Sequence, residues 1–293
     1  IWSGGCLADE RCSHAPVADV AIARKHNIVG NPAWERALVP RPPLPKKAKH
    51  SKATFFWDVK PKTLMLEGTF YMDGSCFESN ISELARCGWG FVCVDDKGII
   101  IASAYGTCPP WVDDIGGAEA WAMLQATSLA VPGKCRFWTD CQPLLIMIAK
   151  GESITSDPKN VYARVHSLVM SQLDDTPLDR IGWMPAHSTS KDLGSLRKGD
   201  GQLLTEIDRN SNGEADRLAK KGASLHRVPT SIVNQWKSHF DIVKERAMWI
   251  GRATAAANHS EEYPYRDSEA ARWKAEAAAR ARSVRRGLKN IKR

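Results

Sequence analysis

The order of strand-like and helix-like segments between residues 68 and 223 constrains the fold of this chain more than any other feature of its sequence. The first part of this region has apolar, strand-like segments at 68–73, 87–94 and 99–105, and turn residues at 95–98 separate the last two. Short connections of this kind favour antiparallel pairing of neighbouring strands. The second part alternates helix and strand patterns: a helix at 118–130, a strand at 134–140, helices at 142–150 and 161–173, a strand at 179–185 and a helix at 212–223.

This order of segments predicts an α/β fold. Strands that alternate with helices pair in parallel, because the helix between them returns the chain to the same end of the sheet. We therefore expect a mixed five-stranded sheet, in which three antiparallel strands are followed by parallel β/α units and helices cover the faces.

The composition changes on both sides of this region and divides the chain into three parts. Residues 40–47 are rich in proline, as is typical of an extended linker. We expect 1–62 to be a largely irregular linker or remnant of an upstream region, 63–228 to be the folded domain, and 229–293 to be a basic helical extension. Within the extension, helices are expected at about 231–252 and 268–286. The chain begins at Ile1 rather than Met, so we expect a fragment of a longer protein.

The net charge of +8 is distributed unevenly along the chain. Residues 41–62 carry +6 and 266–293 carry +7, whereas 63–265 carry −5. Basic extensions around an acidic domain suit a polyanionic substrate, which the extensions hold while metal ions neutralise the reacting phosphate. No apolar stretch approaches the roughly 20 residues of a membrane-spanning helix, so no membrane partner is expected.

The eight cysteines lack the spacing of a disulfide framework. We therefore expect free thiols and an intracellular, reducing compartment. The basic ends suit either a nuclear address or phosphate contacts, so nucleus and cytoplasm both stay open. Cys6, Cys12 and His14 have the chemistry of zinc ligands, but no second pair follows at close spacing, and an unstructured remnant is the alternative.

Four acidic residues carry the strongest indication of chemistry. Asp73, Glu119, Asp140 and Asp216 each lie at the end of a strand-like run or in the first turn of a predicted helix. If their side chains converge, they cannot all stay ionised without a compensating cation. Carboxylate oxygens are ligands suited to Mg²⁺ or Mn²⁺. The sequence therefore predicts a divalent metal site built by these four residues.

Each of these residues also has a simpler structural explanation. Asp73 and Gly74 could form a tight turn, and Asp140 could cap the helix that follows it. Glu119 and Asp216 could be acids that a helix dipole favours. These explanations account for the residues singly, but not for their joint placement where the topology brings strands and helices together.

Alternatives also exist for the fourth acid and for a nearby histidine. Asp208 and Glu214 are alternatives to Asp216, which is favoured because it flanks the apolar stripe of its predicted helix. His187 follows the strand at 179–185. Its imidazole can exchange a proton beside a scissile phosphate, or it can be a solvated loop residue.

Five short motifs in this order resemble those of the type 1 ribonuclease H domain, in particular the version carried by non-LTR (LINE-type) retrotransposon polyproteins. The resemblance extends over about residues 68–223. The motifs are Tyr71-Met72-Asp73-Gly74-Ser75, Ala118-Glu119-Ala120, Thr139-Asp140-Cys141-Gln142, Trp183-Met184-Pro185-Ala186-His187-Ser188 and Asn212-Gly213-Glu214-Ala215-Asp216-Arg217-Leu218-Ala219-Lys220. Each motif alone is a weak signal, but the five in the right order are a strong one.

The resemblance implies a ribonuclease H-like fold and metal-dependent hydrolysis of the RNA strand of RNA–DNA hybrids, with a 3′ hydroxyl and a 5′ phosphate as products. It implies that Asp73, Glu119, Asp140 and Asp216 bind two ions, Mg²⁺ or Mn²⁺. Two such ions can hold the attacking water and the leaving oxygen in line. It also implies that His187 helps proton transfer or product release.

The resemblance further implies how the substrate is held. Ser75 and Gln142 would lie along the minor groove of the hybrid and contact its backbone or 2′-hydroxyls, the groups that distinguish RNA from DNA. A reverse transcriptase upstream in the same polyprotein is also implied. The sequence does not indicate an oligomeric state.

Three features depart from the family pattern. The segment between His187 and Asp216 is long and contains an inserted hairpin or loop at 193–201. Ile115-Gly116-Gly117 stands where asparagines often precede the helix-borne glutamate. The charges of 151–164 nearly balance, so affinity for the hybrid is expected to come from the basic extensions or from a linked polymerase.

Two other functions are alternatives. A nucleic-acid-binding module without activity would need only the basic extensions, and the complete set of acids argues against it. A DNA-acting nuclease or integrase of the same fold would also have an acidic metal site, usually with three acids. The motif around His187 and the signature at 212–220 favour the hybrid nuclease.

Overall fold

The computed structural model describes residues 17–26, 31–45, 52–173, 176, 178–258, 273 and 276–278. The described residues between 44 and 233 form one compact unit, and those of 1–43 and 234–293 form a second. The Cys6, Cys12 and His14 group lies outside the described residues, as does most of the helix expected at 268–286. None of the described helices is long and apolar enough to cross a membrane.

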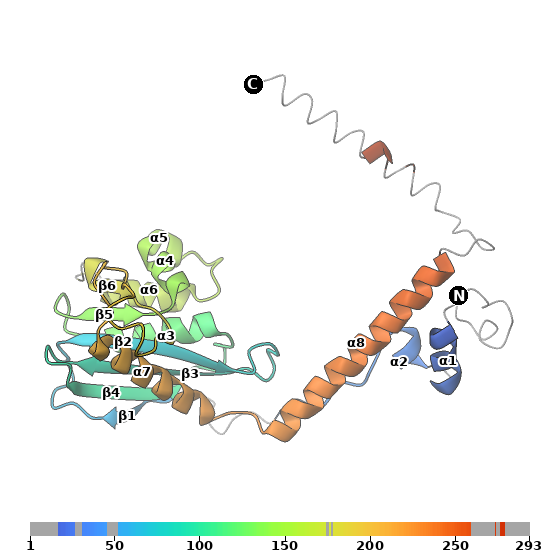
Figure 1. The fold of residues 1–293 in the computed structure, drawn as a ribbon, viewed down its shortest axis with the longest axis horizontal. Helices are drawn as coiled ribbons and strands as arrows, with labels where there is room; N and C mark the ends of the chain where they lie inside the picture. Colours follow the sequence, from blue (N-terminus) through green and yellow to red (C-terminus); the bar gives the residue numbers. More distant parts are fainter. Residues whose placement is uncertain are drawn as a thin grey trace, which may run out of the picture. The chain divides into compact units, whose positions relative to one another are not determined.

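The centre of the first unit is a mixed sheet of six strands (Figure 1). Its strands are β1 (Phe56–Val59), β2 (Thr69–Phe77), β3 (Arg86–Val94), β4 (Ile100–Thr107), β5 (Arg136–Thr139) and β6 (Ile181–Trp183). They lie in the order β1-β4-β3-β2-β5-β6, with antiparallel pairing from β1 to β2 and parallel pairing from β2 to β6. The mixed α/β sheet expected from the sequence is confirmed.

The sheet has one strand more than we expected. Strand β1 comes from a segment that we expected to be part of the linker, and its Phe56 and Trp57 pair with Tyr105 and Ala104 of β4. Aromatic packing explains why it joins the sheet, since the Trp57 ring meets the buried Phe91 ring edge-on at 6.3 Å. We did not expect this strand because the sequence before it is rich in proline and lysine, which is typical of a linker.

Strand β1 also contacts the helix α7 (Glu206–Ser224). The Asp58 carboxylate accepts a hydrogen bond of 2.8 Å from Lys221 Nζ and one of 3.5 Å from Arg217. Both side chains belong to α7. The outer strand is therefore linked to a helix on the face of the sheet as well as to its neighbour β4.

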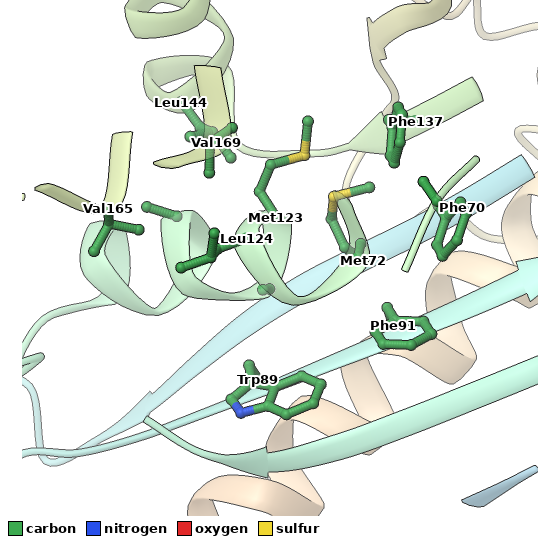
Figure 2. Packing of buried hydrophobic residues seen from close by; sticks show 14 of the residues in the cluster. Phe70, Met72, Trp89, Phe91, Met123, Leu124, Phe137, Leu144, Val165 and Val169 are labelled. Atoms are coloured by element: carbon green, nitrogen blue, oxygen red, sulfur yellow. The ribbon is translucent and has the colours of Figure 1, made fainter. Parts of the chain in front are cut away.

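Helices cover both faces of the sheet (Figure 1). The helices after β4 are α3 (Ile115–Thr127), α4 (Gln142–Ala149), α5 (Glu152–Thr155) and α6 (Ala163–Gln172), with a 3₁₀ turn η2 (Leu178–Arg180) before β6. On one face, Phe70 and Met72 of β2 pack with α3, α4 and α6 in the larger core. Figure 2 shows Met123 of α3 within this cluster. Tyr71, between them in sequence, points to the other face and packs with α7, as the alternation of side chains along a strand requires.

Helix α7 lies close against the sheet because β3 has no side chain at Gly90. A Cβ atom at this position would lie 2.6 Å from the backbone nitrogen of Ala219 and 2.7 Å from Cβ of Leu218. Gly90 is the register partner of Asp73 on β2. The close approach of α7 at this point therefore sets the position of the helix next to Asp73.

Helix α7 begins six residues before the expected start at 212. Thr205 caps it: its Oγ1 accepts a hydrogen bond of 3.1 Å from the backbone of Asp208, and Asp208 Oδ2 accepts one of 3.0 Å from the backbone of Thr205. This reciprocal arrangement is a capping box. The Thr205-x-x-Asp208 pattern was the signal in the sequence that we missed.

The second unit is helical. It contains α1 (Val17–His26), α2 (Pro32–Glu35) and most of α8 (Thr230–Asn258), the helix expected at 231–252. The buried Trp34 ring of α2 meets the Trp249 ring of α8 edge-on at 5.5 Å, and the guanidinium of Arg246 lies 3.4 Å from the Trp34 ring centre. Part of the segment expected to be irregular is thus ordered by aromatic and cation–π contacts.

Candidate metal centre

Three of the four expected acids converge. Oxygen atoms of Asp73, Glu119 and Asp140 lie within 4.8 Å of one another. The sheet explains two of them: β2 and β5 are parallel neighbours with Tyr71 opposite Trp138, and Asp73 and Asp140 each follow two residues later. Glu119 comes from the first turns of α3, which packs on β2.

The approach of α3 to β2 depends on Gly74. A Cβ atom at Gly74 would lie 2.4 Å from the backbone nitrogen of Glu119 and 2.9 Å from Cβ of Ala118. The start of the helix is fixed separately by Asp114, whose Oδ1 accepts a hydrogen bond of 2.7 Å from the backbone of Gly117. Asp73 and Gly74 are interior residues of β2, so the tight-turn explanation for this pair is wrong.

Replacement of Gly74 by alanine is expected to destabilise the fold by about 1–3 kcal/mol and to weaken metal binding, because the added methyl group forces the first turn of α3 away from β2. Gly116→Ala is the control. Gly116 lies in the first turn of α3 itself, and a Cβ added there would meet only Asp114 Oδ1, at 3.5 Å. The control should be neutral or slightly stabilising. Urea denaturation and calorimetric Mn²⁺ titration test both variants, and equal behaviour of the two would contradict the role of Gly74.

The three acids disturb each other's ionisation. Burial, followed by the charges of Asp140 and Asp216, raises the pKa of Asp73 to about 8. Burial, followed by the charges of Asp73 and Asp140, raises the pKa of Glu119 well above its ordinary value. Burial also raises the pKa of Asp140. The cluster therefore resists full ionisation in the absence of a cation.

The donor set fits a hard divalent cation. All the ligand atoms are carboxylate oxygens, the type that Mg²⁺ and Mn²⁺ prefer. Glu119 Oε2 is buried and has no hydrogen-bond partner among the described residues. An unpartnered buried carboxylate oxygen is costly, and coordination of a metal ion is one way to satisfy it. The site is thus compatible with divalent metal binding.

Asp216 lies in the same cavity but has another partner in this structure. Its Oδ2 accepts a hydrogen bond of 2.7 Å from Lys220 Nζ, one turn later on α7. It is close enough to Asp73 for its charge to contribute to the raised pKa of that residue. A ligand role for Asp216 stays a prediction, and only one of its two carboxylate oxygens pairs with Lys220.

The two alternatives to Asp216 lie elsewhere. Asp208 is buried and accepts hydrogen bonds from Tyr71 Oη at 2.8 Å and from Lys198 Nζ at 3.1 Å. It lines a second cavity that contains none of the three converging acids. Glu214 forms a surface ion pair with Arg217 at 2.6 Å. The idea that Asp208 is the fourth ligand is therefore wrong in this structure.

A cavity of about 550 Å³ surrounds the acidic cluster. The predicted site residues on its wall are Asp73, Ser75, Glu119, Asp140, His187 and Asp216. His187 has a left-handed backbone conformation, with φ of 47°, in the segment after β6. Gln142 is not part of the wall: it is exposed at the first residue of α4, next to Pro143, which does line the cavity.

Helix α7 contributes residues that the sequence analysis missed. Arg209, Asn212 and Lys220 line the cavity together with Asp216. A hydrogen bond from the Asn212 side chain lowers the pKa of Asp140 and so opposes the effect of burial. Because the expected helix began at 212, Arg209 lay outside it. Recognition of the capping box would have placed it on the same helix face as Asp216.

No protein-family model matches the chain, and no curated protein matches it. Its structure is similar to RNase H1 from the halophilic archaeon Halobacterium salinarum NRC-1, with 17% identity, 53% of this chain and 96% of that chain covered, and a TM-score of 0.37. LC11-RNase H1 in complex with an RNA/DNA hybrid gives 14% identity, coverage of 53% and 96%, and a TM-score of 0.36. The PFV RNase H domain is 21% identical, with 55% of this chain and 96% of that chain covered and a TM-score of 0.36. Each comparison spans about half of this chain and nearly all of the other.

Proposed function

We propose that this protein is a divalent-metal-dependent endonuclease that hydrolyses the RNA strand of RNA–DNA hybrids. The observation that carries the proposal is the convergence of Asp73, Glu119 and Asp140 on the wall of one cavity, with oxygen atoms within 4.8 Å of one another. The five ordered sequence motifs support the choice of substrate, and the mixed sheet has the antiparallel and parallel parts expected from the sequence.

The residues of the cavity have distinct roles in this proposal. Asp73, Glu119 and Asp140 would hold the metal, and Asp216 would complete the set. A bound divalent metal supplies Lewis acidity and a water of lowered pKa. His187, on the cavity wall, donates a proton to the leaving 3′ oxygen or assists release of the product.

Recognition of RNA is assigned to two polar side chains. Ser75 lies on β2 two residues after Asp73, and its side chain reaches the cavity. Gln142 does not line the cavity; it is exposed and precedes Pro143, which does. We assign both to contacts with the backbone or 2′-hydroxyls of the RNA strand, because the 2′-OH is the group that separates RNA from DNA.

The deciding experiment is cleavage of an RNA–DNA hybrid labelled on its RNA strand, with Mg²⁺ or Mn²⁺ and with a chelator, using the full chain. We expect cleavage of the RNA strand only with metal, and products with a 5′ phosphate. Duplex RNA and duplex DNA of the same sequence serve as controls. Equal cutting of duplex DNA would favour the DNA-acting nuclease or integrase, whereas salt-sensitive binding without cutting would favour an inactive binding module.

The wider context is also a proposal. The resemblance to retrotransposon polyproteins leads us to propose a reverse transcriptase upstream, followed by a linker, a nuclease domain that ends at about 228 and a basic extension at 229–293. Because β1 pairs with β4 in the sheet, we place the start of the nuclease domain upstream of Phe56 rather than at 63. The net charges of +6 at 41–62 and +7 at 266–293 support electrostatic attraction of the hybrid by the extensions. A reducing compartment suits the six described cysteines, all of which are free thiols.

A further inference from the structure

One face of α7 forms a wall of the acidic cavity. The cavity-lining residues of this helix are Arg209, Asn212, Gly213, Asp216 and Lys220. Their spacing of three, four, seven and eleven residues from Arg209 is the spacing of one helix face. The wall therefore extends for about three turns of the helix, and Arg209 lies at the end nearest the start of the helix.

Arg209 differs from the other basic residues of α7. Lys220 pairs with Asp216 at 2.7 Å, Arg217 with Glu214 at 2.6 Å, and Lys221 with Asp58 at 2.8 Å. Arg209 forms no ion pair with any acid among the described residues, and its side chain donates a hydrogen bond of 2.9 Å to Asn210 Oδ1.

The Arg209 side chain is also partly buried at the cavity. Its Nε is inaccessible to solvent and has no hydrogen-bond partner among the described residues. A buried polar donor without a partner is costly, and the cost is greater for a charged group. The guanidinium is a planar fork of donors that matches the oxygens of a phosphate group. An anion in the cavity would satisfy both its charge and its free donors.

The helix geometry places Arg209 near the acidic cluster. Seven residues separate Arg209 from Asp216, which corresponds to roughly 10 Å along the helix axis. Asn212, whose side chain bonds to Asp140 of the cluster, is only three residues from Arg209, or roughly 4.5 Å along the axis. The guanidinium is therefore close enough to reach a phosphate of a strand that is held at the cluster.

We propose that Arg209 binds a non-bridging oxygen of a phosphate that flanks the cleaved bond and so fixes the register of that strand in the cavity. The cleavage rests on the proposed nuclease function, whereas the phosphate contact does not depend on it. Arg209 is a substrate-binding residue in this proposal and takes no part in bond breaking.

The test is binding of a fluorescently labelled RNA–DNA hybrid to the full-length protein, measured by fluorescence anisotropy. A chelator is present so that no cleavage occurs. Arg209→Gln is expected to weaken binding about tenfold and to lower the slope of log Kd against log salt concentration by about 1. Arg217→Gln is the matched control, because it removes the same charge from the same helix outside the cavity. It should change binding by less than about twofold.

A second measurement locates the contact. A hybrid with one neutral methylphosphonate at a phosphate flanking the cleavage site should bind the wild type more weakly but bind Arg209→Gln no differently from the unmodified hybrid. Circular dichroism confirms that both variants are folded. If Arg209→Gln and Arg217→Gln have equal affinities and salt slopes, or if every methylphosphonate weakens both proteins alike, the proposal is overturned.

The two proposals fail in different ways. Binding that depends on Arg209 without metal-dependent cleavage would overturn the nuclease function and leave the phosphate contact in place. Metal-dependent cleavage with an unchanged KM in Arg209→Gln would overturn the phosphate contact and leave the nuclease function in place. In the expected result, Arg209→Gln raises KM and leaves kcat almost unchanged.

Discussion

Asp73→Asn and Asp140→Asn are each expected to abolish hybrid cleavage and at the same time to raise the Tm of the metal-free protein. An amide has no charge and is a poor ligand for Mg²⁺, so the loss of activity should be at least about 10³-fold. The gain in stability has the same physical origin as the metal site. The three carboxylates lie within 4.8 Å of one another, and removal of one charge relieves their mutual repulsion.

Glu214→Gln is the matched control for these variants. Glu214 is an acid of α7 that pairs with Arg217 at 2.6 Å and does not line the cavity. Its replacement should leave cleavage unchanged and alter stability by at most about 0.5 kcal/mol. Tm in chelator and initial rates of cleavage with Mg²⁺ are the measurements. Retention of cleavage by Asp73→Asn would remove Asp73 from the site, and a fall in Tm would show that its carboxylate stabilises the metal-free fold.

The stability of the metal-free protein is expected to decrease as pH rises from about 4 to about 8. The pKa of Asp73 is raised from 3.8 to about 8 in the folded state, mainly by burial. Between these two values, the folded state binds more protons than the unfolded state, so the free energy of unfolding falls with increasing pH. The decrease should be on the order of a few kcal/mol. Glu119, whose pKa is also raised, acts in the same direction.

Divalent metal should reverse this dependence. A cation that binds only the folded state stabilises it by about 2.7 kcal/mol at a concentration 100 times its Kd, and it binds best to the ionised carboxylates at the upper end of the pH range. Urea denaturation at pH 5, 6.5 and 8, with chelator and with Mg²⁺, tests both statements. A free energy of unfolding that rises with pH in chelator would contradict the raised pKa of Asp73. A pH dependence of the free energy of unfolding that Mg²⁺ leaves unchanged would contradict metal binding.

The sequence predicts the acidic cluster because its signals are local and strong. Asp73 and Asp140 follow apolar runs that form neighbouring parallel strands, and Glu119 comes early in a well-defined helix. The mixed sheet, with β2 and β5 as parallel neighbours, brings these acids together. The same reasoning places Asp216 near the cavity, but it does not show whether its side chain faces the cluster or Lys220.

Other features were not predictable in the same way. The pair between Lys220 and Asp216 depends on side-chain rotamers, which a residue pattern does not specify. Strand β1 has only four residues, and its neighbours in sequence suggest a linker. Arg209 is different, because the capping box at Thr205 would have placed it on the helix. That error came from an unrecognised helix start.

The outer strand β1 has a consequence for any attempt to isolate the unit that contains the sheet. A polypeptide that starts at residue 63 would lose β1, and with it the partner that covers the free edge of β4. Unpaired strand edges promote association between molecules. It would also lose Asp58, which holds Lys221 and Arg217 of α7, the helix that bears Asp216 and Arg209. A piece that keeps these two contacts has to include all of β1. To keep the backbone hydrogen bond from Thr54 to Thr107 as well, it has to begin upstream of Thr54. The start of the folded unit therefore lies within the segment whose composition predicts a linker.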